Sequence, residues 1–105
     1  MATIELKGSE WKEFSKAEYA VIDCYGDQCS ACVMLEPVFD GVADELAGIS
    51  FGRINITHYE EIAEAYEITA LPTMLFFRKG EMVDQMIGSV EREDLLEQMA
   101  KFLYQ

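Results

Sequence analysis

The segment Tyr19–Cys32, "YAVIDCYGDQCSAC", joins a compact apolar run to two cysteines three positions apart. Its first half has the composition of a buried strand, in which Asp23 is the only charged residue. After Cys29, apolar residues recur at the spacing of one helical face, at Leu35, Val38, Phe39, Val42 and Leu46. The segment therefore predicts a strand, a junction that carries both cysteines, and a helix.

The flanking sequence predicts further strands and helices in alternation. Strands are expected at residues 3–6, 49–56, 73–77 and 82–87. Ser9 is expected to cap a first helix, "THYE" at Thr57–Glu60 fits a capping box that opens a short helix, and a last helix carries residues 95–103. The turn "RKGE" should join the last two strands as a hairpin.

This order of elements predicts an α/β fold. The central sheet should be mixed, parallel at first and antiparallel at the end, with helices on both faces. No repeat, linker or low-complexity tract interrupts the 105 residues, so residues 1–105 are expected to form a single domain.

The charge balance limits the classes of partner. Eight basic and twenty acidic residues give a net charge of -12, which opposes binding to nucleic acid and to anionic membrane. The N-terminal sequence lacks the pattern of a secretory signal, and the longest apolar runs are too short to span a bilayer. We therefore expect a soluble protein of the cytoplasm, where an isolated cysteine pair is more often catalytic or metal-bound than a permanent cross-link.

The Cys-X-X-Cys spacing occurs both in zinc sites and in redox proteins. A structural zinc site needs further ligands, and the sequence offers only Cys24 and His58, so no metal site is expected. A pair at the start of a helix favours redox chemistry, because free backbone N–H groups and the helix dipole stabilise a thiolate there.

The chain resembles the thioredoxin family over essentially its full length. The resemblance is carried by "VIDCYGDQCSAC", by Pro37 within the helix, by "ALPT" at Ala70–Thr73, by the "RKGE" turn and by the glycine of "MIGS". It implies a thioredoxin fold, with a central mixed five-stranded sheet flanked by four helices.

The resemblance also implies the site residues. The redox-active pair would be Cys29 and Cys32, the buried acid Asp23, and the active-site cis-proline Pro72, while Arg53 takes the place of a lysine near the acid. The family's usual Trp-Cys-Gly-Pro-Cys is altered here, and the altered positions are expected to influence partner choice and redox potential. The substrate-binding residues would be Gln28, Ser30, Ala31, Leu71, Pro72 and Gly88.

Each of these residues has an expected role in disulfide exchange. Cys29 would attack, Cys32 would resolve the mixed disulfide, and Asp23 would accept the proton of Cys32. Arg53 cannot donate a proton, so its expected role is electrostatic support of ionised Asp23. Ala31, unlike proline, has an N–H, and we hypothesise that this group donates a hydrogen bond to the Cys29 thiolate and makes the protein more oxidising.

The expected function is a thiol–disulfide oxidoreductase that reduces protein disulfides. Its partners would be a thioredoxin reductase or equivalent electron donor and disulfide-containing proteins; it would act as a monomer and hold no bound cofactor. Two alternatives stay open, a less reducing exchanger or isomerase and a redox sensor or binding module without turnover. Cys24 should be a buried, inert residue on the opposite face of its strand from Asp23, and His58 should be exposed.

Overall fold

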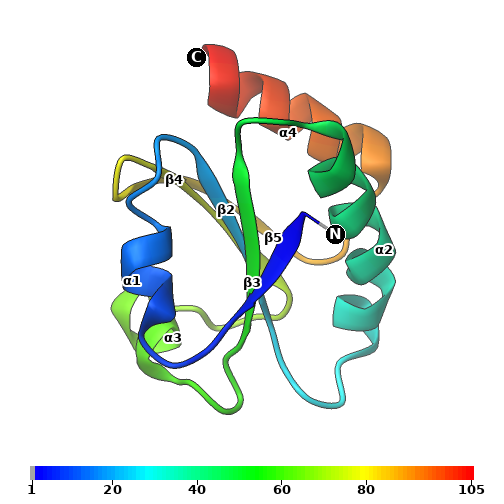
Figure 1. Cartoon of the computed structure of the whole chain (residues 1–105). Coiled ribbons are helices and arrows are strands. Elements are labelled where there is room, and N and C mark those ends of the chain that lie inside the picture. The colour runs from blue at the N-terminus through cyan, green and yellow to red at the C-terminus, as the bar shows by residue number, and fades with distance from the viewer. Residues whose placement is uncertain (1) are drawn as a thin grey trace.

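The computed structural model describes residues 2–105, which form a central sheet with helices on both sides (Figure 1). The elements along the chain are β1 (Thr3–Leu6), α1 (Glu10–Phe14), β2 (Ala20–Tyr25), α2 (Ser30–Glu45), β3 (Ser50–Asn55), α3 (Glu61–Ala65), β4 (Thr73–Arg78), β5 (Glu81–Ile87) and α4 (Arg92–Tyr104). The predicted number and order of elements are confirmed, although several bounds differ, by as much as three residues at the start of α4.

The five strands are arranged in the order β1-β3-β2-β4-β5. β3 pairs in parallel with both β1 and β2, whereas β4 is antiparallel to β2 and to β5. The sheet is therefore mixed as predicted, and Thr3–Leu6 is an edge strand. β2 is the middle strand and β4 is its neighbour. Both are almost completely buried because helices cover both of their faces.

Side chains that alternate along β2 divide the core into two layers. Val21 packs with buried side chains of α2 and α4, including Phe39 and Met99. Ile22 and Cys24 face the other way, toward α1 and α3. Figure 1 shows the same division, with α1 and α3 on one side of the sheet and α2 and α4 on the other. Asp23 shares the parity of Val21 and so points to the side that α2 covers.

Two predicted helix caps are wrong. Ser9 occupies the N-cap of α1, but its side chain makes no capping hydrogen bond; instead Glu10 Oε1 accepts one from Lys7 N–H at 2.6 Å. α3 begins only at Glu61, after the predicted capping box, and Glu60 at its N-cap makes no side-chain bond. Thr57 is engaged elsewhere, because its hydroxyl accepts a hydrogen bond from Asp27 N–H at 3.0 Å.

The hairpin between β4 and β5 is confirmed and turns on two residues. Lys79 and Gly80 both have positive φ, at 52° and 89°. Positive φ at both central positions is typical of a two-residue type I′ turn, which matches the twist of the flanking strands. Backbone bonds from Lys79 N–H to Ala17 and from Gly80 N–H to Ser15 hold this turn against the end of α1.

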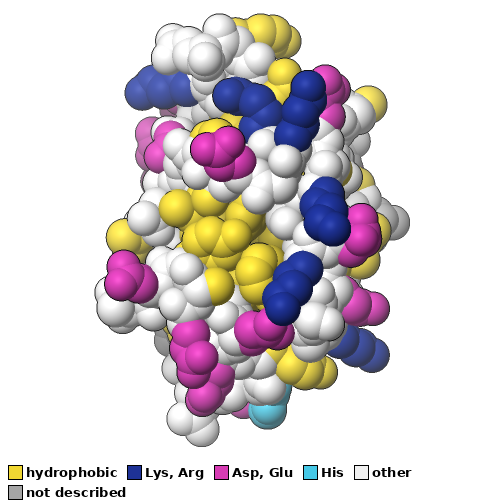
Figure 2. All heavy atoms as spheres, turned by 90° about the vertical axis from the view of Figure 1, so that its left-hand side faces the viewer, with side chains coloured by type: hydrophobic (Ala, Val, Ile, Leu, Met, Phe, Trp, Pro, Cys, Tyr) yellow, Lys and Arg dark blue, Asp and Glu magenta, His cyan; other side chains and the backbone are white. Residues whose placement is uncertain are grey.

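The face of the molecule that carries α1 and the β4–β5 side shows apolar side chains gathered at its centre, with basic and acidic side chains around them (Figure 2). Partly buried hydrophobic residues of this side pack on the α1–α3 core layer, among them Phe14, Tyr66 and Met82. No helix within residues 2–105 is long and apolar enough to cross a membrane.

Candidate functional site

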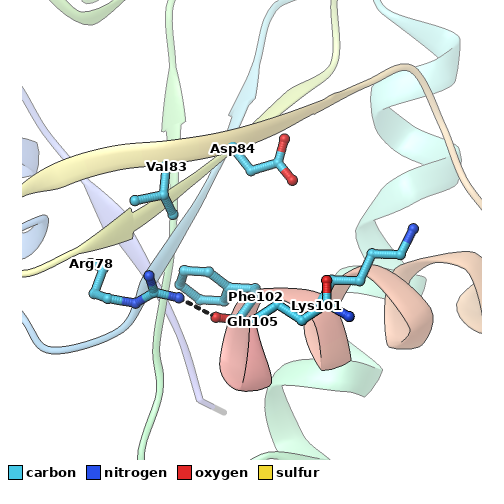
Figure 3. A pocket seen from close by; sticks show the side chains of 6 residues that line it. All are labelled: Arg78, Val83, Asp84, Lys101, Phe102 and Gln105. Atoms are coloured by element: carbon cyan, nitrogen blue, oxygen red, sulfur yellow. Dashed lines mark hydrogen bonds between the residues drawn. The ribbon is translucent and has the colours of Figure 1, made fainter.

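A hollow of about 290 Å³ lies between the end of β4, β5 and the end of α4 (Figure 3). Its lining residues are Arg78, Val83, Asp84, Lys101, Phe102 and Gln105. Arg78 crosses it and donates a hydrogen bond to the Phe102 carbonyl at 2.5 Å. β4 runs away from the cysteines over six residues, roughly 20 Å. This hollow is therefore at the far end of the sheet from the thiol chemistry.

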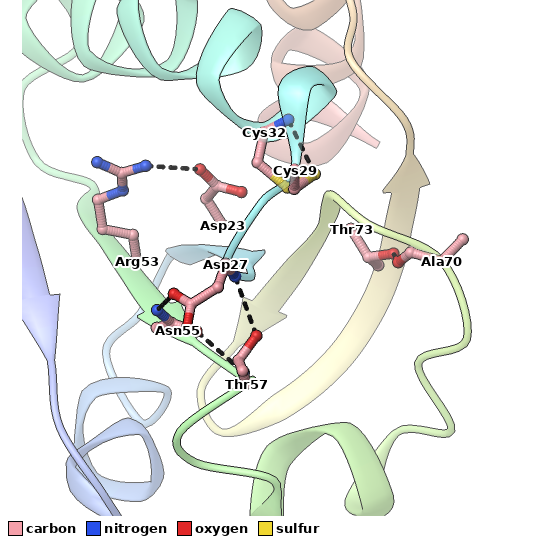
Figure 4. The surroundings of a disulfide bond; sticks show 9 residues. All are labelled: Asp23, Asp27, Cys29, Cys32, Arg53, Asn55, Thr57, Ala70 and Thr73. Atoms are coloured by element: carbon pink, nitrogen blue, oxygen red, sulfur yellow. Dashed lines mark hydrogen bonds and ion pairs between the residues drawn. A yellow bond between two sulfur atoms is a disulfide. The ribbon is translucent and has the colours of Figure 1, made fainter.

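The two cysteines lie at the first turn of α2 and form a disulfide bond (Figure 4). Cys29 is the N-cap residue in extended conformation, and its Sγ accepts a hydrogen bond from Cys32 N–H at 3.1 Å. Cys29 is half-buried, whereas only 2% of Cys32 is exposed. A substrate can thus reach Cys29 but not Cys32, which gives the two sulfurs different positions in any exchange reaction.

The loop that delivers Cys29 is fastened to the turn after β3 (Figure 4). Asp27 N–H donates to Thr57 Oγ1 at 3.0 Å, and Asp27 Oδ1 accepts from Asn55 Nδ2 at 2.9 Å. Thr57 N–H in turn donates to Asn55 Oδ1 at 2.9 Å. These contacts fix the loop from outside, and Gln28, with a φ of 53°, then turns the chain into the N-cap.

Gly26 is required by a close approach between this loop and the chain before β4. A Cβ at position 26 would lie 2.7 Å from Leu71 Cδ1 and 2.8 Å from Thr57 Oγ1, both shorter than real Cβ contacts. The absence of a side chain at Gly26 therefore lets the loops after β2 and β3 and the segment before β4 meet beside the cysteines.

Asp23 is fully buried in the centre of the sheet, as predicted. It lies between Arg53 of β3 and Met74 of β4 in the strand register, on the side covered by α2. Neither carboxylate oxygen has a hydrogen-bond partner in the described chain. Burial raises its pKa from 3.8 to about 7; Arg53 opposes this rise, and the nearby carboxylates of Asp40, Glu36 and Glu5 add to it.

Arg53 reaches toward Asp23, also as predicted, but it is shared with a second acid. Its Nη2 is 3.8 Å from Asp23 Oδ2, and its Nη1 is 3.1 Å from Glu36 Oε2. The side chain of Arg53 is only 13% exposed. The ion pair with Asp23 is thus the longer of the two.

Pro72 lies directly before β4, is buried, and follows Leu71 through a cis peptide bond, in agreement with the prediction. Its carbonyl accepts a hydrogen bond from Gly88 N–H at 2.8 Å, and Gly88 has a φ of 94°. The structure therefore brings Leu71, Pro72 and Gly88 together at one end of the sheet, the end at which β2 leads into the cysteine loop.

The three altered positions around the cysteines lie at or near the surface. Gln28 and Ser30 are exposed and Ala31 is half-buried, on either side of Cys29. In the disulfide form the hydrogen bond to Cys29 Sγ comes from Cys32 rather than Ala31, so the hypothesis about Ala31 and the thiolate stays a prediction.

Cys24 and His58, for which no role in the reaction is expected, have the predicted exposure. Cys24 is buried and unpaired on the opposite face of β2, and burial raises its pKa well above that of an ordinary thiol. The His58 side chain is exposed, and its Nε2 lies 3.0 Å from Asp27 Oδ2. Within residues 2–105 no group of three His, Cys, Asp or Glu side chains is arranged to hold a metal.

Several residues that shape the site were missed by sequence reasoning, namely Gly26, Asp27, Glu36, Asn55 and Thr57. A signal existed for three of them. Asn55 is the last residue of β3, and Asp27 and Thr57 lie shortly after the carboxyl ends of the parallel strands β2 and β3. Side chains of neighbouring loops converge at this edge in α/β sheets. Glu36 gave no such signal, because its contact with Arg53 depends on how α2 packs across β3.

Chemically, the site combines an accessible sulfur, a buried second sulfur and a buried carboxyl whose pKa is raised to about 7 by burial. Disulfide exchange needs a thiolate that attacks, a second thiol that resolves the mixed disulfide, and a route for the proton. The arrangement provides a group suited to each of these needs.

Comparison with known proteins agrees with this chemistry. The family model described as Thioredoxin matches residues 2–101. A thioredoxin of Mycoplasmoides gallisepticum is 35% identical over 77 residues, which cover 73% of this chain and 77% of that protein. The chloroplastic M-type thioredoxin of Spinacia oleracea is 34% identical over 102 residues, which cover 94% of this chain but 56% of the spinach protein.

Among solved structures, a mutant thioredoxin from Halobacterium salinarum NRC-1 superimposes with a TM-score of 0.87. The match covers 95% of this chain and 89% of that one, at 24% sequence identity. This likeness shows that the two chains share a fold.

Proposed function

The chain belongs to the thioredoxin family and is a dithiol–disulfide oxidoreductase, and from this premise we propose that it reduces protein disulfides with electrons from a separate reductase. The observation that carries the proposal is the unequal exposure of the two sulfurs, with Cys29 at the N-cap of α2 and Cys32 buried behind it. A pair arranged in this way can form a mixed disulfide at one sulfur only and resolve it from within.

In the proposed reaction the Cys29 thiolate attacks one sulfur of the substrate disulfide. A Cys29–substrate disulfide forms, and the other substrate sulfur leaves as a thiolate. Cys32, once deprotonated, then attacks Cys29 Sγ, which forms the Cys29–Cys32 disulfide and releases the second substrate thiolate. The substrate gains two electrons and the protein loses two, and the reductase returns them.

Attack by Cys29 is assisted by its place at the start of α2. The N–H of Cys32 already donates to Cys29 Sγ, and a 16-residue helix directs its positive end at this sulfur. Both interactions favour a thiolate over a thiol. When a reductase thiolate attacks Cys29 Sγ, the Cys29–Cys32 bond breaks and Cys32 leaves as a thiolate. A second reductase thiolate then attacks the reductase sulfur of the mixed disulfide and releases Cys29 as a thiolate, which the same groups stabilise.

We assign the proton of Cys32 to Asp23. The carboxyl lies under α2 with both oxygens free of hydrogen bonds, and its pKa of about 7 lets it accept and release a proton near neutral pH. Arg53 moderates this pKa, since its positive charge favours the ionised form against the cost of burial. The role proposed for Arg53 is therefore electrostatic support.

Substrates are proposed to lie across the surface next to Cys29 as an extended chain. The N–H and C=O of Leu71 take part in no hydrogen bond among the described residues, so they are free to pair with a substrate backbone. Gly88, whose N–H donates a hydrogen bond to the Pro72 carbonyl, would border the substrate chain on the side opposite Leu71. Three exposed apolar residues stand near these elements, Val33 and Met34 after Cys32 and Ile87 before Gly88, and they would contact apolar substrate side chains.

The proposal includes a monomer that holds no bound cofactor and works in the cytoplasm. Support for a reducing compartment comes from the unpaired thiol of Cys24, because unpaired cysteines are typical of proteins kept under reducing conditions. The spinach relative is chloroplastic by name, so membership of the family does not by itself identify the compartment.

A trapping experiment tests the proposal. Cys32→Ser should retain a mixed disulfide at Cys29 with substrate proteins and lose catalytic reduction of a protein disulfide in the presence of dithiothreitol. Cys24→Ala is the matched control and should keep wild-type turnover. Wild-type protein that binds disulfide substrates without turnover would instead support a sensor or binding module, and efficient exchange between disulfides without net reduction would support an isomerase.

A further inference from the structure

Arg53 is held between two carboxylates of different exposure. Asp23 is completely buried, whereas the Glu36 side chain is 47% exposed at the surface of α2. The guanidinium approaches Glu36 to 3.1 Å, which is hydrogen-bond distance, but stays 3.8 Å from Asp23. Figure 4 shows the guanidinium of Arg53 directed at the Asp23 carboxyl, with a dashed line for the ion pair between them.

Tyr25 packs against the guanidinium of Arg53. The guanidinium carbon of Arg53 is 4.5 Å from the centre of the Tyr25 ring, a stacking distance. The ring itself is anchored, because the Tyr25 hydroxyl donates to Glu5 Oε2 at 2.7 Å. The Tyr25 ring thus covers one side of the guanidinium, while the Nη1 and Nη2 groups lie toward Glu36 and Asp23.

We propose that Glu36 is a positioning residue, which holds Arg53 one step away from Asp23 and so keeps the buried carboxyl able to carry a proton. Without the Glu36 carboxylate, Arg53 would be free to move the short distance needed for a direct hydrogen bond to Asp23. A charge-assisted bond of that kind favours the ionised carboxylate strongly. The inference rests on the proton-accepting role proposed for Asp23.

Apart from Arg53, the charged groups around Asp23 raise its pKa, as Glu36 does. Asp40, also on α2, and Glu5, on β1, are acids that raise the pKa of Asp23, and Glu36 itself does so through its charge. Arg53 is the one nearby group that lowers it. Loss of Glu36 therefore removes a repulsive charge and releases the attractive one, and both changes favour ionisation of Asp23.

The consequence for the reaction is a shift in its pH dependence. If Asp23 ionises at lower pH, it is a weaker base toward Cys32 near neutrality, and the step in which Cys32 resolves the mixed disulfide becomes slower at neutral pH. Glu36 itself touches neither sulfur nor substrate in this scheme, so it affects the reaction only through the protonation of Asp23, by holding Arg53 and by its own negative charge.

Glu36→Gln tests the proposal, with Glu45→Gln as the control. Glu45 is on the same helix, its side chain is 49% exposed, and it also pairs with an arginine, Arg92. The ionisation of Asp23 is followed by NMR of its side-chain carboxyl carbon in the disulfide form, where no thiol titrates. We expect Glu36→Gln to lower the midpoint by about half a pH unit or more, and Glu45→Gln to leave it unchanged. Glu36→Asp, which keeps the charge, should retain most of the wild-type value.

Two outcomes would overturn parts of this account separately. An Asp23 midpoint that is the same in wild type and Glu36→Gln would refute the positioning role of Glu36. A lowered midpoint with an unchanged pH profile of turnover would support the positioning role but refute Asp23 as the proton acceptor of Cys32. Because the NMR measurement needs no substrate, the two failures are distinguishable.

Discussion

Asp23→Asn should stabilise the protein, and more so at high pH. Folding raises the pKa of this carboxyl from 3.8 to about 7, so the folded protein takes up a proton between these values. The free energy of unfolding of the wild type therefore falls as the pH rises through this window, by about 1.4 kcal/mol per pH unit. Over a window of about three units the loss is roughly 4 kcal/mol, a large share of the stability of a small domain.

Asparagine has nearly the shape of the protonated carboxyl and does not ionise, so the variant avoids this loss. Relative to wild type it should be more stable by about 4 kcal/mol at pH 8.5 and by about 2 kcal/mol at pH 5. Unfolding in urea, followed through the fluorescence of the buried Trp11, measures both values. The disulfide form is used at each pH, so that titration of Cys29 and Cys32 does not contribute.

Asp44→Asn provides the control, because Asp44 is an exposed aspartate near the end of α2. It should change the free energy of unfolding by less than about 1 kcal/mol. A difference between Asp23→Asn and wild type that is the same at pH 5 and pH 8.5 would refute the reasoning, since it would mean that the Asp23 carboxyl ionises alike in the folded and unfolded chains.

Further predictions concern the loop and the unpaired thiol. Gly26→Ala should destabilise the protein by about 1–3 kcal/mol in urea unfolding and slow turnover, because the added Cβ meets Leu71 and Thr57; unchanged stability would show that the loops separate freely. Thr57→Val removes the acceptor for Asp27 N–H and should cost about 0.5–1.5 kcal/mol, while a neutral result would mean that water replaces this bond. In the reduced native protein, iodoacetamide at pH 8 should modify no more than two cysteines by mass and leave Cys24 unmodified until urea is added; early modification of Cys24 would contradict its burial.

The fold was predictable because its elements are encoded by local patterns. The apolar run through Ile22, the helical spacing after Cys29 and the Lys79–Gly80 turn each specify one element, and their order specifies a mixed sheet. The burial of Asp23 followed from its place inside an apolar strand. The two helix caps were wrong because short polar side chains have several possible partners, and Thr57 bonds across to Asp27 rather than to its own helix.

The surroundings of the site were less predictable than its central residues. Resemblance to a family located the cysteines and Pro72, and Arg53 was expected near Asp23. The second contact of Arg53, with Glu36, was not expected, because it joins a strand to a helix and no local sequence pattern predicts it. Gly26 was missed for a similar reason, since a close approach between two loops appears only once both are placed.

The equilibrium reduction potential of the Cys29–Cys32 pair decides whether the protein is a disulfide reductase. The protein is equilibrated in graded thiol/disulfide buffers, and alkylated cysteines are counted by mass, with Cys24→Ala to remove the third thiol. A disulfide reductase should have a potential near that of thioredoxins, about −270 mV, below the biochemically determined glutathione poise of roughly −220 to −260 mV. A potential near or above about −200 mV would contradict the reductase and would favour an exchanger or isomerase, with Ser30-Ala31 as its cause.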